Sequence, residues 1–470
     1  MDIKVSDIVK ICGGKLILGD ENTICENFSK DTRAIQKDDV YVGIKGENFD
    51  GNTLYMQALE NGAKVCIISG IDVSEEVKRK YEDKCIILVD DTIKALQQIA
   101  SYKRSLYNIP VIAITGSVGK TSTKDIVSSV VGTAFNVLKT EGNMNNHIGL
   151  PMTILKLKNH NALVVEMGMN NLGEISLLTK IAKPNIAIIT NVGTAHIGNL
   201  GSRENILKAK LEILEGLQEN GTLIINNDND LLNEWSKKYS GSVNVFTYGI
   251  DNKSDIMASN IDLGETTSKF QLEVDEKQRA YVGNGEQINV PVGGKHFVYN
   301  ALCAISVGKL LGIKIENVKH GIEKFELSKN RMEIFKVKSI TVVNDCYNAN
   351  FDSMKAGIES IAKMEGKRKI AVLGDMLELG DFSKDLHYKV GLEVVKNNID
   401  MLITVGKESK NIADATKESK IYPENVFTFD KNEDAIELIK NTVADGDVIL
   451  VKASNGMKFI EIVNALKNLK

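Results

Sequence analysis

The chain has few of the features that mark secreted, membrane-bound or nucleic-acid-binding proteins. Its six cysteines are scattered without a CxxC pair, which is typical of reduced thiols rather than of zinc ligands or disulfides. Lys and Arg (58) nearly balance Asp and Glu (62), so the net charge of -4 provides no basic surface for nucleic acid. No apolar run approaches the length of a membrane span, and the first residues lack the apolar core of a signal peptide. We therefore expect a cytoplasmic protein without membrane insertion or nucleic-acid binding, which acts on small molecules.

The chain also has only five prolines and no Ser/Gly tract, so the linkers between domains are expected to be short. A length of 470 residues is too great for one hydrophobic core and predicts about three domains. We expect an α/β protein with a small α/β domain over residues 1–90, which includes a helix near 54–63 and a strand at 64–69. Residues 91–326 are expected to form a central domain with a parallel sheet, and residues 327–470 a doubly wound, Rossmann-like domain without a GxGxxG turn.

The most informative motif is a glycine-rich turn after the apolar run 111–115. It reads Gly116-Ser117-Val118-Gly119-Lys120-Thr121. A strand that breaks on glycines and restarts as a helix presents unpaired N–H groups to phosphates; a lysine adds positive charge, and a Thr hydroxyl can bind Mg²⁺. The usual pattern places four residues between the first Gly and Gly-Lys, whereas this chain has two. An ordinary strand-to-helix turn is the alternative to a nucleotide site.

Polar residues follow two further apolar runs of the central domain. Glu166 comes after the run 162–165, and His196 lies in a short segment after the run 186–190. Ligands of parallel sheets gather at the carboxyl ends of the strands, so Glu166 could bind Mg²⁺, and His196 could reach a second metal or the substrate. A solvated carboxylate and a loop histidine are the alternatives.

The expected helix 204–216 carries a lysine on its apolar face. Lys210 lies four residues from both Ile206 and Leu214, whereas Lys208 falls on the polar face. Such a lysine can extend its ammonium group to solvent. Alternatively, burial lowers its pKa so that the amine reacts with CO₂, and the resulting carbamate is a metal ligand.

Six motifs together give a specific resemblance that covers all three expected domains. They are the phosphate loop 115–121, Thr140 to Asn146 (TEGNMNN), Glu166-Met167-Gly168, Asn191 to His196 (NVGTAH), Asn344 to Asn350 (NDCYNAN) and Leu373 to Gly380 (LGDMLELG). On these motifs the chain resembles the Mur ligase family of ATP-dependent amide-bond-forming enzymes, in which the short phosphate loop is normal. It is most similar to the branch that adds D-alanyl-D-alanine to UDP-N-acetylmuramoyl-tripeptide, and those two molecules, with ATP and Mg²⁺, are the implied partners. A monomer is expected.

The resemblance implies roles for individual residues. Lys120 would bind the β- and γ-phosphates, Thr121 and Glu166 one Mg²⁺, and His196 with carbamoylated Lys210 a second. Lys120, Glu166, His196 and Lys210 would form the catalytic set. The implied ATP site consists of Gly116, Ser117, Val118, Gly119, Lys120, Thr121, Ser122, Asn300, Arg331 and Asp345. The implied contacts to the other substrates are Ser29, Asp31, Thr32, Arg33, Lys45, Asp50, Asn145, Asn146, Asn348 and Asn350.

Structural roles and rival functions compete with these assignments. Asp31 could cap a turn, Arg331 could be a surface cation, and the segment 348–350 could be a local turn. Two places depart from the family pattern: Phe351 stands where proline is usual, and Lys452-Ala453-Ser454-Asn455 replaces Lys-Gly-Ser-Arg. The rival functions are another Mur-type ligase, such as a folylpolyglutamate or cyanophycin synthetase relative, and a non-catalytic nucleotide-binding scaffold.

Overall fold

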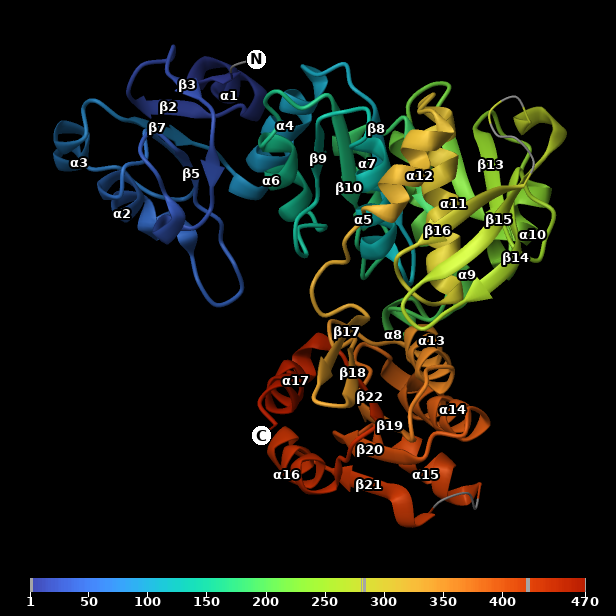
Figure 1. Cartoon of the computed structure of the whole chain (residues 1–470). Helices are drawn as coiled ribbons and strands as arrows, with labels where there is room; N and C mark the ends of the chain where they lie inside the picture. The colour runs from blue at the N-terminus through green and yellow to red at the C-terminus, as the bar shows by residue number, and fades with distance from the viewer. Residues whose placement is uncertain (1–2, 280, 282–284, 420–422, 470) are drawn as a thin grey trace.

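Three bodies follow one another along the chain, each built on its own main sheet (Figure 1). The structure is a computed structural model, which describes residues 3–279, 281, 285–419 and 423–469. The N-terminal body lies beside helices α4 and α6 of the central body, and the C-terminal body lies on another side of the central body. None of the helices in the described part of the chain is long and apolar enough to cross a lipid bilayer.

The N-terminal body contains a mixed sheet in the order β2-β7-β6-β5-β4, in which only β2 is antiparallel to its neighbour. A helix and a strand predicted from the sequence are confirmed as α2 (Tyr55–Glu60) and β6 (Val65–Ile68). The remaining elements are β1 (Ile3–Lys4), α1 (Val5–Cys12), β2 (Lys15–Leu18), β3 (Ile24–Cys25), β4 (Phe28–Ser29), β5 (Val40–Val42), α3 (Glu75–Lys80) and β7 (Cys85–Leu88).

The central body contains a long sheet in the order β16-β15-β14-β13-β12-β11-β8-β10-β9. The strands from β14 to β9 run parallel, and β15 and β16 add an antiparallel edge that was not predicted. The strands are β8 (Val111–Thr115), β9 (Val137–Lys139), β10 (Ala162–Glu166), β11 (Ile186–Ile189), β12 (Thr222–Asn226), β13 (Asn244–Gly249), β14 (Ile256–Leu263), β15 (Ser268–Val274) and β16 (Glu286–Val290).

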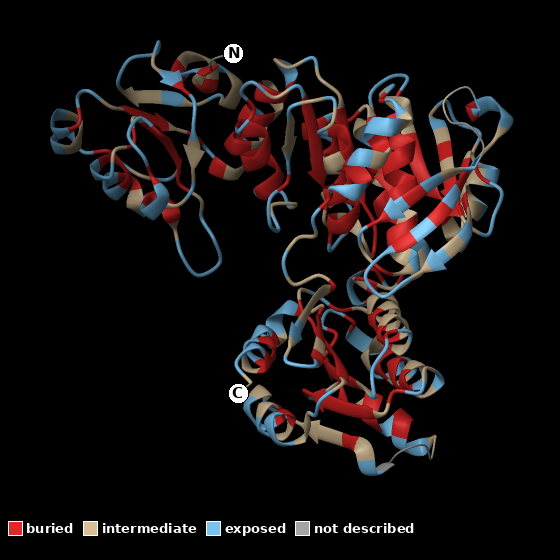
Figure 2. Cartoon of the chain, in the orientation of Figure 1, coloured by how far each residue is buried: buried red, intermediate tan, exposed pale blue. Residues whose placement is uncertain are grey.

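Helices cover both faces of this sheet, so its central strands are buried (Figure 2). They are α4 (Thr92–Ser105), α5 (Lys120–Val131), α6 (Gly149–Leu155), α7 (Glu174–Ala182), α8 (Ile197–Leu200), α9 (Arg203–Leu211), α10 (Asp230–Lys238), α11 (Lys295–Leu310) and α12 (Ile315–Glu323). The predicted helix 204–216 is wrong in its second half, because α9 ends at Leu211 and a 3₁₀ turn follows. Thr179 Oγ1 donates to the carbonyl of Ile213 at 2.8 Å, so contact with α7 accompanies the change of helix type.

The C-terminal body contains a doubly wound sheet in the order β17-β18-β22-β19-β20-β21, in which only β17 is antiparallel. This confirms the Rossmann-like class and all five strands that were predicted. The strands are β17 (Glu333–Val337), β18 (Ile340–Asn344), β19 (Arg368–Gly374), β20 (Met401–Val405), β21 (Val426–Phe429) and β22 (Asp447–Lys452). The helices are α13 (Phe351–Ala362), α14 (Ser383–Lys396), α15 (Lys410–Glu418), α16 (Asn432–Thr442) and α17 (Ile460–Lys467).

Candidate active site

The backbone of the glycine-rich loop between β8 and α5 adopts a conformation that favours glycine at two positions. Gly116 and Gly119 have φ values of +155° and +82°, which side-chain-bearing residues rarely adopt. A Cβ on Gly116 would lie 1.9 Å from Thr190 Oγ1, so the loop packs directly against the end of β11. Asn191 fixes the loop further, since its Oδ1 accepts from Val118 N at 2.9 Å. These contacts hold the loop backbone at the start of α5.

Lys120 and Glu166 come together at this loop. Lys120 Nζ donates to the carbonyl of Gly116 at 2.7 Å, and burial lowers the pKa of Lys120 despite the nearby Glu166 carboxylate. Thr121 Oγ1 donates to Glu166 Oε2 at 2.8 Å, and Asn145 Nδ2 donates to Glu166 Oε1 at 2.7 Å. Glu166 is buried, so it is not the solvated strand-end carboxylate that the sequence left as an alternative.

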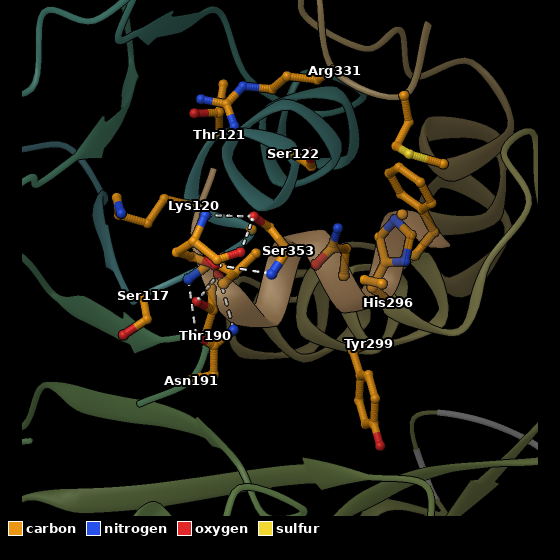
Figure 3. A pocket seen from close by; sticks show the side chains of 18 of the residues that line it. Ser117, Lys120, Thr121, Ser122, Thr190, Asn191, His296, Tyr299, Arg331 and Ser353 are labelled. Atoms are coloured by element: carbon orange, nitrogen blue, oxygen red, sulfur yellow. Dashed lines mark hydrogen bonds between the residues drawn. The ribbon is translucent and has the colours of Figure 1, made fainter. Parts of the chain in front are cut away.

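A cavity extends from the loop to the C-terminal body (Figure 3). Asn300, Arg331 and Asp345 line it together with loop residues 117–122. Thr123 Oγ1 donates to Asn300 Oδ1 at 3.0 Å, and the Arg331 guanidinium lies 4.0 Å from the centre of the Tyr347 ring. The structure therefore brings together the predicted ATP-site residues from two bodies, and Arg331 is part of a cavity wall rather than a cation on the outer surface.

Sequence reasoning missed three further residues of this cavity. His296 lies across the cavity from Lys120 (Figure 3), and burial lowers its pKa to about 4. Tyr299 donates through its hydroxyl to Asp228 Oδ2 at 2.9 Å. Lys452 Nζ lies 2.5 Å from Asp345 Oδ2 and donates to the carbonyl of Asn348 at 3.0 Å. His296 and Tyr299 stand within four residues of Asn300 in the sequence, which is the signal that could have found them.

Lys210, one of the two residues predicted for the second metal site, is deeply buried. Lys210 is 1 % exposed, and burial together with the nearby Lys120 lowers its pKa well below the usual value, whereas Lys208 is exposed. The burial predicted from the apolar face is thus confirmed, and extension of the ammonium to solvent is excluded. His196 Nδ1 lies 2.7 Å from Glu378 Oε2 of the C-terminal body. In the described part of the chain, no three His, Cys, Asp or Glu side chains gather into a ready metal site.

A second cavity lies in the N-terminal body and is partly closed by Ile148 of the central body. Asp31, Thr32 and Arg33 line it, as does the exposed ring of Phe49. Asp31 also caps a 3₁₀ turn by accepting from Arg33 N at 3.0 Å and binds the Arg33 guanidinium at 2.7 Å, which lowers the pKa of Asp31 to about 2. Asp31 therefore both caps the turn and lines the cavity.

Other predicted substrate contacts support the walls of the cavities. Ser29 Oγ donates to the carbonyl of Asp31 at 3.1 Å, and Lys45 forms a β-bridge with Asp50, whose side chain accepts from Asn52 N. Asn146 Oδ1 accepts from Gly149 N at 2.8 Å at the start of α6. For these residues a contact with substrate stays a prediction.

The segment 348–350 lines the nucleotide-side cavity and also begins a helix. Asn350 caps α13 by accepting from Ser353 N at 2.9 Å. Phe351, where the family usually has proline, occupies the first helical position, at which proline is favoured and other residues are tolerated. Asp352 follows, and its Oδ2 accepts from Thr194 N at 3.0 Å and from Thr194 Oγ1 at 3.2 Å. This contact ties α13 to the segment that carries His196.

Comparison with known proteins shows similarity along nearly the whole chain. Residues 114–308 match the Mur ligase middle domain, and residues 330–455 match the Mur ligase, glutamate ligase domain. The UDP-N-acetylmuramoyl-tripeptide--D-alanyl-D-alanine ligase of Bacillus subtilis is 38% identical over 449 residues, which are 95% of this chain and 94% of that protein. Crystal structure I of MurF from Acinetobacter baumannii superposes with a TM-score of 0.88 at 27% identity and covers 99% of both chains.

A MurF ligase from Thermotoga maritima, solved in complex with ADP, superposes with a TM-score of 0.81 at 26% identity and covers 94% of this chain and 97% of that one. The similarity thus spans all three bodies rather than the nucleotide loop alone. The two family domains together match more than half of the chain. The chain belongs to the Mur ligase family.

Proposed function

We propose that this protein is the ATP-dependent ligase that joins D-alanyl-D-alanine to UDP-N-acetylmuramoyl-tripeptide. The observation that carries the proposal is the cavity between two bodies, in which the phosphate loop faces Asp345, Asn348 and Lys452. A relative that is 38% identical over nearly the full length of both proteins is named for this activity. An enzyme that activates a carboxylate with ATP and then admits an amine needs such a site between domains, because water has to be excluded from the activated intermediate.

The three bodies of the chain provide a separate binding region for each of the three substrates. We assign the UDP end of the acceptor to the N-terminal cavity, ATP to the cavity of the phosphate loop, and the dipeptide to the C-terminal body. The corresponding domain boundaries are 1–90, 91–326 and 327–470. A monomer working in the cytoplasm is part of the proposal, in keeping with the absence of a membrane-spanning helix from the described residues.

The reaction proceeds in two steps. An oxygen of the tripeptide's terminal carboxylate attacks the γ-phosphorus of ATP; a new P–O bond forms, the bond to the β,γ-bridging oxygen breaks, and ADP leaves. The dipeptide amine then attacks the carbonyl carbon of the acyl phosphate, inorganic phosphate leaves, and the amine loses a proton. Charge develops on phosphoryl and carbonyl oxygens throughout, so Lys120 and the N–H groups of the loop stabilise it and no protein nucleophile is needed.

The residues present fit a magnesium ion at the phosphate loop. The Thr121 hydroxyl and the Glu166 carboxylate, 2.8 Å apart, are hard oxygen donors of the type Mg²⁺ prefers, and both would hold the ion with nucleotide phosphates. When bound, Mg²⁺ neutralises phosphate charge. We further propose His196 and carbamoylated Lys210 for a second ion, since Lys210 is buried and has no hydrogen bond or ion pair within the described residues.

The experiment that tests the proposal is phosphate release measured with each substrate left out in turn. Release should need ATP, UDP-N-acetylmuramoyl-tripeptide and D-alanyl-D-alanine together. Steady release with a folate or with glutamate as the amine would favour another Mur-type ligase. Nucleotide binding without turnover under every condition would favour a scaffold.

A further inference from the structure

A buried lysine ends one of the inner strands of the C-terminal sheet. Lys452 is the last residue of β22 and is 2 % exposed, although it lines the cavity of the phosphate loop. β22 pairs in parallel with β18, which ends at Asn344, so Lys452 and Asp345 lie at the same edge of the sheet. Because a buried charge is costly unless it is paired, the partners of Lys452 indicate what it does.

The donors of Lys452 are all directed at one loop. Its Nζ donates to Asp345 Oδ2 at 2.5 Å, to the carbonyl of Asn348 at 3.0 Å and to the carbonyl of Asp345 at 3.4 Å. An ammonium group has three N–H donors, so the loop 345–348 accounts for all of them. Lys452 therefore has no donor left for the phosphates of a nucleotide, although it lines the same cavity.

Asp345 keeps acceptor capacity at the cavity wall, where 15 % of its side chain is exposed. Its Oδ2 is taken by Lys452, whereas Oδ1 accepts only from Met332 N, at 3.2 Å, among the described residues. A carboxylate oxygen can accept two hydrogen bonds, so Oδ1 can accept one more. The hydroxyl groups of a sugar are suitable donors, and a carboxylate that accepts from a ribose hydroxyl is common in nucleotide sites of doubly wound sheets.

We propose that Lys452 is a positioning residue for ATP: it fixes the loop 345–348 by holding Asp345 Oδ2 and the carbonyl of Asn348, which leaves Asp345 Oδ1 to accept from a ribose hydroxyl. The inference rests on the proposed function, in which this cavity binds ATP. It gives a role to a buried charge that the reaction steps do not use. The alternative is that Lys452 binds phosphate directly, and the two roles predict different effects of the number of phosphates.

The test measures nucleotide binding rather than turnover. Calorimetry on the full chain with Mg²⁺ gives the affinities for AMP, ADP and a non-hydrolysable ATP analogue, for wild type, Lys452→Met and Arg368→Met. Arg368 is the matched control, because it forms an ion pair of 2.7 Å with the buried Asp447 at the other end of β22. We expect Lys452→Met to weaken all three nucleotides by the same factor, about 10- to 100-fold, and Arg368→Met to leave them unchanged. A loss that grows with each added phosphate would contradict positioning.

Nucleotides that lack one sugar hydroxyl test the ribose contact. Either 2′-deoxy-ADP or 3′-deoxy-ADP should bind wild type more weakly than ADP does. The same analogue should bind Lys452→Met about as well as ADP does, because Asp345 is no longer held toward the sugar. Equal binding of ADP and both analogues by wild type would overturn the ribose contact.

A double variant covers the case in which Lys452→Met leaves an unpaired buried carboxylate and unfolds. Thermal unfolding checks the fold of each variant, and Asp345→Asn removes that charge. Because Lys452 acts through Asp345, Lys452→Met should weaken ADP binding much less in the Asp345→Asn background than in wild type. Equal losses in the two backgrounds would overturn the inference. If wild type binds no adenine nucleotide, the proposed function fails. If wild type and Lys452→Met bind all the nucleotides equally well, only this inference fails.

Discussion

Thr121 and Glu166 are joined by a hydrogen bond of 2.8 Å between Oγ1 and Oε2. Thr121 is the second residue of α5, and Glu166 ends β10, which pairs with the strand that leads into the phosphate loop. Thr121 and Glu166 are 45 residues apart in the sequence. The parallel pairing of β8 with β10 brings the hydroxyl of one and the carboxylate of the other together. The proposed first Mg²⁺ binds where these two groups meet.

Glu166→Ala should therefore raise the Mg²⁺ concentration needed for half-maximal phosphate release. We expect a shift of about tenfold or more, with partial recovery of turnover at high Mg²⁺, because the loss of one ligand weakens affinity before it alters geometry. Glu219→Ala is the control, since Glu219 is exposed. An unchanged Mg²⁺ dependence would remove Glu166 from the metal site.

Lys120→Ala should abolish ATP turnover and leave the fold intact. The Lys120 amine bonds to the loop carbonyl of Gly116, so the variant loses phosphate-directed charge and little packing. We expect kcat to fall by at least about 100-fold, as for loss of one electrostatic group from a transition state. Thermal unfolding checks the fold, and near-normal phosphate release would contradict the phosphate-loop assignment.

Arg33→Ala should raise the KM for the UDP-linked substrate much more than the KM for ATP. Arg33 lines the N-terminal cavity and is held by Asp31, well away in the chain from the phosphate loop. Arg79→Ala, an exposed arginine of the same body, serves as the control. Equal changes in both KM values would leave Arg33 with a structural role only.

Lys210→Ala should inactivate the enzyme, whereas Lys208→Ala should have little effect. Burial lowers the pKa of Lys210, which favours the neutral amine, and the neutral amine is the form that reacts with CO₂. Short carboxylic acids should restore part of the activity of Lys210→Ala by supplying the missing anionic oxygens. Full activity of Lys210→Ala would exclude the carbamate.

His296 should make stability fall with acid over a defined window. Burial lowers its pKa from 6.5 to about 4, so between these values the unfolded chain binds a proton that the folded chain does not. The free energy of unfolding should therefore decrease as pH falls from 6.5 to 4, by at most about 3 kcal/mol. Urea unfolding of wild type and His296→Gln at several pH values measures the difference. Parallel pH dependences would contradict a lowered pKa for the half-buried His296.

Much of the site follows from local sequence. A glycine-rich turn after a strand predicted the phosphate loop, strand ends predicted Glu166, and the helical spacing of Ile206 and Leu214 predicted the burial of Lys210. Each of these signals depends on neighbours within a few residues along the chain. The exact end of α9 could not be predicted from local sequence, because the hydrogen bond from Thr179 of α7 to the carbonyl of Ile213 accompanies it.

Contacts between bodies could not be predicted from local patterns. The pairs His196–Glu378 and Thr194–Asp352 join residues more than 150 positions apart, and nothing near either partner indicates the other. The antiparallel edge of β15 and β16 does not follow from the alternation of strands and helices, which predicts parallel strands only. These strands are positioned by pairing at the edge of the parallel sheet, where β15 pairs with β14 and β16 pairs with β15.

ATP is expected to activate the acceptor's carboxylate as an acyl phosphate, from which the amide bond then forms. The most direct test of this activation is to label the terminal carboxylate of UDP-N-acetylmuramoyl-tripeptide with ¹⁸O and to analyse the released phosphate and the peptide product by mass spectrometry. We expect one ¹⁸O atom in each phosphate, formed in step with the dipeptide-extended product. Phosphate without label, or phosphate released without any new peptide bond, would contradict it.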